Sequence, residues 1–310
     1  NPRWENSAGD TLGAYTNVNL VTPIWDAPAT GPVDHYEYSF QSPIAGWSAP
    51  EPFYTTSIPD QSFYGGGDSG TEGVWQFRVR TVSASGLTSD WAVAPTITYD
   101  KTLPGLPVHE FPADNSFINY NNFWFEWTDA TDAVSYETQY SQNPAVDVNG
   151  AFQNVQWSGD YQNIQPSSSN AHSVGANGTW YWQVRAVDVA GNKSAWTSPW
   201  KVTIDMSTPT LPTSSMTQDS DNASVLNGGQ TNSQYFTFTL ASSPDTVRYQ
   251  LKYWNDIPAS PYKLLAPWNP SDLSGYSPVL GTYKDNFTQG DGVHYFAFSA
   301  CDLAGNCSAY

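Results

Sequence analysis

The stretch GTWYWQVRAVDVAGNKSAW, residues 178–196, decides the fold of this chain because it occurs three times in altered form. It aligns without a gap with GVWQFRVRTVSASGLTSDW, residues 73–91. It also aligns without a gap with GVHYFAFSACDLAGNCSAY, residues 292–310. A similarity that recurs at the spacing of a whole domain predicts an array of repeated units.

Each copy of this stretch begins with an alternation of apolar and polar residues. Such a period of two predicts a β-strand with one buried face. In the second copy the apolar face consists of Trp180, Trp182, Val184 and Ala186. The same alternation occurs in FWFEW (123–127) and YFTFTL (235–240), so each unit is expected to hold several half-buried strands.

A second motif recurs upstream of each copy. The segments 33–40, 133–140 and 246–253 each contain a tyrosine that is followed four residues later by another aromatic residue. Because this motif keeps the same order relative to the first one, it supports the same three units.

The expected domain boundaries lie at two matching segments, DKTLPGLP (100–107) and DMSTPTLP (205–212). Proline fixes φ and removes a hydrogen-bond donor, so it ends a strand and stiffens a linker. We therefore expect three domains, residues 1–101, 102–206 and 207–310.

The composition narrows the class of protein. The 310 residues include 14 Trp, 19 Tyr, 14 Phe, 23 Gly and 23 Pro, and the net charge is −18. Aromatic residues favour strands, whereas Gly and Pro favour turns. So acidic a chain does not neutralise phosphate, which argues against nucleic acid and anionic lipid as partners.

No apolar run has the length of a membrane span. The sequence starts at Asn1 without a signal peptide, which predicts a portion of a longer protein.

Short antiparallel strands at this spacing predict a two-sheet sandwich for each unit. With an early Trp, a Tyr-containing central strand and YWQVRAVDVAGNKSAWTSP (181–199), each unit resembles fibronectin type III domains and similar bacterial immunoglobulin-like repeats. The resemblance covers essentially the whole chain. It implies an all-β fold of three tandem antiparallel sandwiches in an elongated array, but it implies little about activity.

The resemblance places DVAGN (188–192) in the turn between the last two strands of its unit. In the third copy Cys301 and Cys307 then face each other across this turn, and an antiparallel pair at that spacing suits a disulfide. Two reduced, buried cysteines are the alternative. The disulfide is the prediction adopted here, and it implies an oxidising compartment.

The third unit differs from the others at its end. Units one and two continue through AVAPTITYD (92–100) and TSPWKVTID (197–205), which predict a last strand, whereas the third has no such residues. Either the parent chain continues, which we favour, or a strand of a neighbouring molecule completes the sheet. Residues 1–15 are the candidate donor for the second case.

The sequence contains no convincing catalytic set. Gly67, Asp68, Ser69 and Gly70 resemble the nucleophile segment of chymotrypsin-like proteases, but that chemistry needs a histidine base, and His35 lies in a strand pattern instead. A Gly-rich loop explains the segment. The histidines, which lack the spacing of metal ligands, are His35, His109, His172 and His294. We therefore expect no enzyme activity.

Calcium is the cofactor worth testing. The acidic residues at equivalent positions at or just beyond the two boundaries are Asp100, Asp114, Asp205 and Asp219. Asp188 and Asp302 also occupy the same turn in two units. Calcium binds several carboxylate and carbonyl oxygens, which a boundary can collect from two domains, although aspartate is also common in turns.

The leading functional prediction is a non-enzymatic extracellular spacer or building block of a cell-surface stalk, surface layer or filament. Its expected partners are other copies, surface proteins or glycans. The alternative is a carbohydrate- or protein-binding accessory region of an exported enzyme. Aromatic residues outside the repeated strands could stack on sugars in that case, namely Trp47, Tyr54, Trp157, Trp254 and Trp268.

Overall fold

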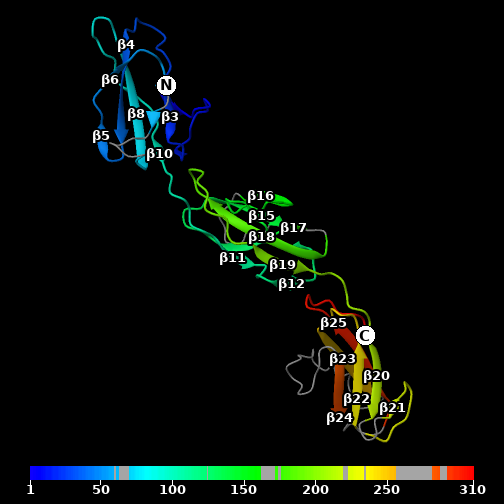
Figure 1. The fold of residues 1–310 in the computed structure, drawn as a ribbon. Helices are drawn as coiled ribbons and strands as arrows, with labels where there is room; N and C mark the ends of the chain where they lie inside the picture. The colour runs from blue at the N-terminus through cyan, green and yellow to red at the C-terminus, as the bar shows by residue number, and fades with distance from the viewer. Residues whose placement is uncertain are drawn as a thin grey trace.

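The computed structural model describes residues 1–58, 61–62, 70–123, 125–161, 172–173, 176–218, 223–233, 235–255, 281–286 and 292–310. The regular elements in these ranges are β-strands, and none of these residues belongs to a helix that could cross a membrane. Figure 1 shows the strands in three groups that follow one another along the molecule: repeat 1 (β1 to β10), repeat 2 (β11 to β19) and repeat 3 (β20 to β25). Each group surrounds its own hydrophobic core, which confirms the predicted all-β sandwich fold.

Repeat 1 consists of two facing sheets. Its strands are β1 (Arg3–Glu5), β2 (Tyr15–Thr16), β3 (Leu20–Ile24), β4 (His35–Ser42), β5 (Ala45–Trp47), β6 (Glu51–Phe53), β7 (Gln61–Ser62), β8 (Gly73–Val82), β9 (Ala92–Val93) and β10 (Ile97–Tyr99). One sheet has the order β1-β3-β7, and the other has the order β2-β10-β8-β4-β5. The last strand, β10, thus lies between an antiparallel and a parallel neighbour.

Repeat 2 follows the same path. Its strands are β11 (Val108–Phe111), β12 (Ser116–Ile118), β13 (Asn122–Phe123), β14 (Glu126–Thr128), β15 (Ser135–Ser141), β16 (Trp157–Tyr161), β17 (His172–Ser173), β18 (Gly178–Val187) and β19 (Trp200–Ile204). The larger sheet has the order β12-β19-β18-β15-β16, and the pairs β11-β14 and β13-β17 face it. Here β19 takes the place of β10, with β12 as its parallel neighbour.

Repeat 3 departs from this path at its edge. Its strands are β20 (Thr213–Gln218), β21 (Ser224–Val225), β22 (Tyr235–Ala241), β23 (Arg248–Asn255), β24 (Gly281–Asn286) and β25 (His294–Cys301). One sheet has the order β21-β20-β22-β24, and β25 pairs with β23. The strand that would correspond to β2 and β12 is β21, and it folds back onto β20.

The alternation in the repeated stretch produces the cores. In repeat 2, Trp180, Trp182 and Val184 are buried on one face of β18, and the last strand adds Val202 and Ile204. On the other face Arg185 pairs with Glu137 on the adjacent β15 (2.5 Å), and Gln183 is buried and donates to Gln139 Oε1 (3.1 Å). The last strand therefore supplies part of the core, in addition to closing the sheet.

In repeat 3 the positions equivalent to Trp180 and Trp182 are His294 and Phe296, and both are only half-buried. Among the described residues, β25 pairs with β23 and no strand of repeat 3 takes the place of β10 or β19. Residues 1–15, the candidate donor, are used within repeat 1: β1 pairs with β3, and Trp4 lies in the core. Completion of repeat 3 by a continuing chain or by a neighbour stays a prediction, and the structure does not favour these residues as the donor.

Candidate functional site

The candidate functional site is the pair of junctions between repeats. We call residues 100–107 joint 1–2 and residues 205–212 joint 2–3. Each joint starts directly after a last strand, β10 or β19, and ends at the first strand of the next repeat, β11 or β20. Figure 1 shows each joint as one stretch of chain without regular structure between two sandwiches. The contacts along this stretch therefore determine how far one repeat can move against the next.

The start of each joint is bound to the repeat that precedes it. In joint 1–2 the Lys101 N–H donates to Glu72 Oε1 (2.9 Å), and Thr102 Oγ1 donates to Glu72 Oε2 (3.0 Å). In joint 2–3 the Met206 N–H donates to Asn177 Oδ1 (3.0 Å), and Asn177 Nδ2 donates to Ser207 Oγ (2.7 Å). Glu72 and Asn177 each stand directly before the long strand of the repeated stretch, so they are equivalent anchors.

The end of each joint is bound to the repeat that follows it. The Gly105 N–H donates to the carbonyl oxygen of Thr131 (3.0 Å). At the equivalent place the Thr210 N–H donates to Ser243 Oγ (3.1 Å), and Ser242 Oγ donates to the Thr210 carbonyl (2.6 Å). The prolines that precede these residues, at positions 104 and 209, are buried. Both linkers are thus held at two points and stiffened between them.

A third contact joins the two repeats directly. Asn192 Nδ2 in repeat 2 donates to the carbonyl oxygen of Asp100 at the end of repeat 1 (2.9 Å). Asn306 Nδ2 in repeat 3 donates in the same way to the carbonyl oxygen of Asp205 (2.6 Å). Asn192 is 7% exposed and Asn306 is 8% exposed, so each amide is removed from solvent and depends on these partners.

An aspartate holds each of these asparagines in place. Asp188 Oδ1 accepts from the Asn192 N–H (2.8 Å), and Asp188 Oδ2 accepts from Asn192 Nδ2 (2.8 Å). Asp302 makes the same two bonds to Asn306, at 2.9 Å and 2.8 Å. We call residues 188–192 and 302–306 the docking turns. Gly191 has φ = 89° in the first of them, which is a conformation that favours glycine.

The predicted disulfide is present and closes the second docking turn. Cys301 and Cys307 are bonded, with their Cα atoms 4.1 Å apart. They form an antiparallel bridge at the base of the turn, and Val187 and Lys193 form the same bridge in repeat 2 without a covalent bond. The turn therefore does not need the disulfide for its shape, and the disulfide adds stability to it.

Reduction of this disulfide is expected to lower the free energy of unfolding of repeat 3 by about 2 kcal/mol, because it releases a short loop in the unfolded chain. Thermal unfolding with and without reductant measures the effect. The double variant Cys301→Val/Cys307→Lys, which copies repeat 2, should not respond to reductant. Equal unfolding of the wild type under both conditions would contradict the prediction.

The structure brings together one group of carboxylates at joint 2–3. Oxygens of Asp205, Asp245 and Asp302 lie within 4.8 Å of one another. Of the predicted calcium ligands, Asp205 belongs to this group and Asp100 lies at the equivalent end of repeat 1, whereas Asp114 accepts from the Lys201 N–H inside repeat 2 (2.8 Å). Asp219 lies outside the described residues. Calcium binding stays a prediction. Isothermal titration calorimetry with calcium checks it, and Asp245→Asn, which removes one carboxylate of the group, should bind calcium more weakly than the wild type.

The aromatic residues proposed as sugar contacts do not gather on one surface among the described residues. Trp47 packs against the guanidinium of Arg78 (4.3 Å from the ring centroid), and Trp157 stacks on Tyr140 (5.4 Å between centroids). Tyr54 is 72% exposed. The side chain of Trp254 and all of Trp268 lie outside the described residues.

The histidines whose side chains are described lie in three different repeats. Ser69 lies outside the described residues, as does the side chain of His172. His35 pairs with Asp34 at the start of β4 (2.9 Å), and His294 is half-buried on β25. His109 is buried between the rings of Trp182 and Trp200. It is a core residue at the position that Trp4 occupies in repeat 1.

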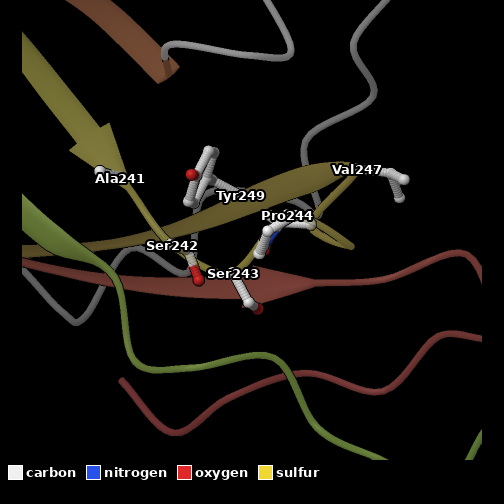
Figure 2. A pocket seen from close by; sticks show the side chains of 7 residues that line it. Ala241, Ser242, Ser243, Pro244, Val247 and Tyr249 are labelled. Carbon is white, nitrogen blue, oxygen red and sulfur yellow. The ribbon is translucent and has the colours of Figure 1, made fainter.

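A hollow of about 380 Å³ lies beside joint 2–3. Figure 2 shows Ser242, Ser243 and Pro244 along the loop that follows β22, with Tyr249 on the neighbouring strand. Its other lining residues are Ala241, Thr246 and Val247. Its described lining residues are uncharged, and both serines already bind the linker, so it belongs to the joint.

The asparagines of the docking turns and the anchors Glu72 and Asn177 were not among the functional residues predicted from the sequence. A signal for the asparagines was present, because Asn192 and Asn306 coincide in two copies of the repeat whereas Leu87 stands there in the first copy. Asp245 could have been found in the same way, since it matches Asp132 in the alignment of the central tyrosines.

No family model matches the sequence, and no curated protein matches it. Among solved structures, the chain is similar to the chicken CNTN1 FN1–FN3 domains, with 11% identity over 93% of this chain and 90% of that chain and a TM-score of 0.36. It is also similar to the chicken interferon gamma receptor alpha chain, with 9% identity over 60% of this chain and 92% of that chain and a TM-score of 0.25. By its own repeated sequence and strand order, the chain is a tandem array of β-sandwich repeats.

Proposed function

We propose that this chain is a non-enzymatic spacer of an extracellular, cell-surface structure such as a stalk, a surface layer or a filament. In this role it holds the parts on either side of it at a set distance and in a set direction. The observation that carries the proposal is that both joints make the same three kinds of contact, at equivalent residues.

The joints are built to resist bending. A flexible linker would leave the repeats free, whereas these linkers are short, contain buried prolines and are bound at both ends. Each net hydrogen bond contributes about 1 kcal/mol, and several act together at each joint. A force or a thermal fluctuation that bends the array must therefore break several contacts at once.

One further observation supports a location outside the cell. The bond between Cys301 and Cys307 is a type of cross-link that persists in oxidising compartments.

Small-angle X-ray scattering of residues 1–310 tests the proposed shape. We expect a radius of gyration clearly above the roughly 19 Å of a single compact globule of this length, because three sandwiches in line spread their mass along one axis. The scattering should also fit one rigid shape, without a flexible ensemble. A compact particle, or a strongly flexible one, would contradict the spacer.

Binding experiments separate the spacer from the carbohydrate-binding alternative. A spacer should give no signal on a glycan array above that of a denatured control. A reproducible signal that is lost in Trp47→Ala or Trp157→Ala, with the fold intact by circular dichroism, would favour the alternative. Both variants are needed because these two residues lie in different repeats.

A further inference from the structure

We propose that the docking turn is a recognition element that binds the end of the last strand in the preceding repeat. Asn192 and Asn306 are its positioning residues, because they fix how one repeat is oriented on the next. This inference deepens the proposed function and rests on it, since it identifies the surface on one repeat and the partner surface on the other.

The acceptor of each bridging hydrogen bond is held rigidly. The Asp100 N–H donates to the Thr16 carbonyl (2.9 Å), so residue 100 extends the pairing of β10 with β2, and the Asp205 N–H donates in the same way to the Ile118 carbonyl (2.9 Å). The peptide that carries the Asp100 carbonyl is held at its other end, where the Lys101 N–H donates to Glu72, and the Met206 N–H holds the Asp205 peptide in the same way through Asn177. A carbonyl that is fixed by the sheet edge and by the anchor residue gives the docking turn a target of defined direction.

The donor is held equally well. The amide of Asn192 has two N–H bonds, of which one is used by Asp188 Oδ2 and the other by the Asp100 carbonyl. Because the amide is planar, these two bonds fix its orientation together. Separation of the repeats would remove the second partner of this donor, and water would have to replace it. Asn306 and Asp302 repeat this arrangement at joint 2–3.

The glycine of each docking turn lies against a second asparagine of the preceding repeat. A Cβ atom placed on Gly191 would lie 3.7 Å from Asn17 Nδ2, and one placed on Gly305 would lie 3.9 Å from Asn119 Nδ2. Asn17 directly follows β2 and Asn119 directly follows β12. The partner surface therefore includes the ends of both the last strand and its parallel neighbour.

Repeat 1 shows that the turn does not need the aspartate and the asparagine for its own folding. Its turn at residues 83–87 has the same backbone bonds, from the Ser83 N–H to the Leu87 carbonyl (2.9 Å) and from the Gly86 N–H to the Ser83 carbonyl (2.8 Å). Gly86 has a positive φ of 79° as well. Yet Ser83 and Leu87 replace the aspartate and the asparagine there.

The repeat 1 turn also differs in its surroundings. Leu87 is 74% exposed, and a Cβ placed on Gly86 would meet nothing within 4 Å. The Asp and Asn pair thus occurs in the two turns that meet a preceding repeat in this structure. It is absent from the turn that, among the described residues, meets none. This difference assigns the pair to docking.

The test transfers the turn of repeat 1 into repeat 2. In the variant Asp188→Ser/Asn192→Leu, the amide hydrogens of joint 1–2, such as those of Lys101 and Gly105, should exchange with deuterium at least ten times faster. Exchange in joint 2–3 and in β18 should not change. Asn306→Ala should have the reverse effect, with faster exchange in joint 2–3 alone. Leu87→Ala serves as the matched control and should leave both joints as they are.

The result has a clear meaning in each case. If amide hydrogen exchange in joint 1–2 is unchanged in Asp188→Ser/Asn192→Leu, the docking role is overturned. This holds even if scattering shows the wild type to be elongated and rigid. Faster exchange in β18 as well as in the joint would also overturn it, because the pair would then serve the folding of repeat 2. A compact or flexible wild type would instead contradict the spacer itself.

Discussion

Replacement of Trp182 by alanine is expected to lower the free energy of unfolding of repeat 2 by about 3–5 kcal/mol. Trp182 is 1% exposed, and its ring lies 4.6 Å from that of Phe125 and 4.2 Å from that of His109, between centroids. Alanine removes these contacts and leaves a cavity that the surrounding strands cannot fill by small movements. Chemical denaturation, with hydrogen exchange in β18 to identify the repeat, measures the loss.

Trp182→Phe is the matched control for this prediction. Phe77 occupies the same position in repeat 1 and is buried there, so the fold accommodates a single ring at this place. Among the described residues, Trp182 Nε1 has no hydrogen-bond partner, so phenylalanine removes no bond. We expect a loss well below that of the alanine variant. Equal losses in the two variants would show that the ring contacts do not carry the stability of this core.

Acid is expected to destabilise repeat 2 through His109, by about 3 kcal/mol between pH 8 and pH 4. His109 is 8% exposed, and burial lowers its pKa from 6.5 to about 4. A hydrogen bond to the backbone of Trp182 and the charge of Asp114 act in the opposite direction and do not compensate. Its Nε2 lies 3.1 Å from Thr197 Oγ1, which also accepts the Val184 N–H (3.0 Å), so the Thr197 hydroxyl can donate its hydrogen to Nε2 of the neutral ring.

The sign of this effect follows from the two pKa values of His109. Between pH 6.5 and about pH 4 the unfolded chain binds a proton that the folded repeat does not bind. Stability is therefore complete above the unfolded pKa and falls as the pH decreases toward the folded one.

His109→Phe tests this assignment. Carboxylates throughout the chain titrate in the same range, so the quantity to compare is the change in stability between pH 8 and pH 4 in the wild type and in the variant. The variant should lose less stability over this range, by about 3 kcal/mol. The measurement is thermal unfolding, with hydrogen exchange to follow repeat 2. The same pH dependence in both proteins would contradict the low pKa of His109.

The strands and cores could be predicted from the sequence because they depend on local alternation. Trp180, Trp182 and Val184 are buried as the period of two requires, since every second side chain of a strand reaches the same face. The cross-link between Cys301 and Cys307 was also accessible, because both residues border one turn. In each case the partners are set by a short-range rule that applies wherever the fold occurs.

The contacts of the joints depend on rules that sequence does not display. The acceptor of Asn192 is a main-chain carbonyl, and any residue at position 100 would supply one. The burial of His109 could not be predicted from the residue type, because histidine is often exposed. His109 is a core residue because its place in repeat 2 is the place that Trp4 takes in repeat 1. Comparison of the repeats with one another, residue by residue, recovers part of this information.

The docking turn and the strand end that it binds are different surfaces, which gives the array a polarity. An association of two unlike surfaces is heterologous, and when it recurs without closing it generates a helix with a constant rotation and translation per unit. Further sandwiches that carry a docking turn could be added to such an array through the same type of joint. An antiparallel neighbour could not use the same contacts, so the array has a defined head and tail.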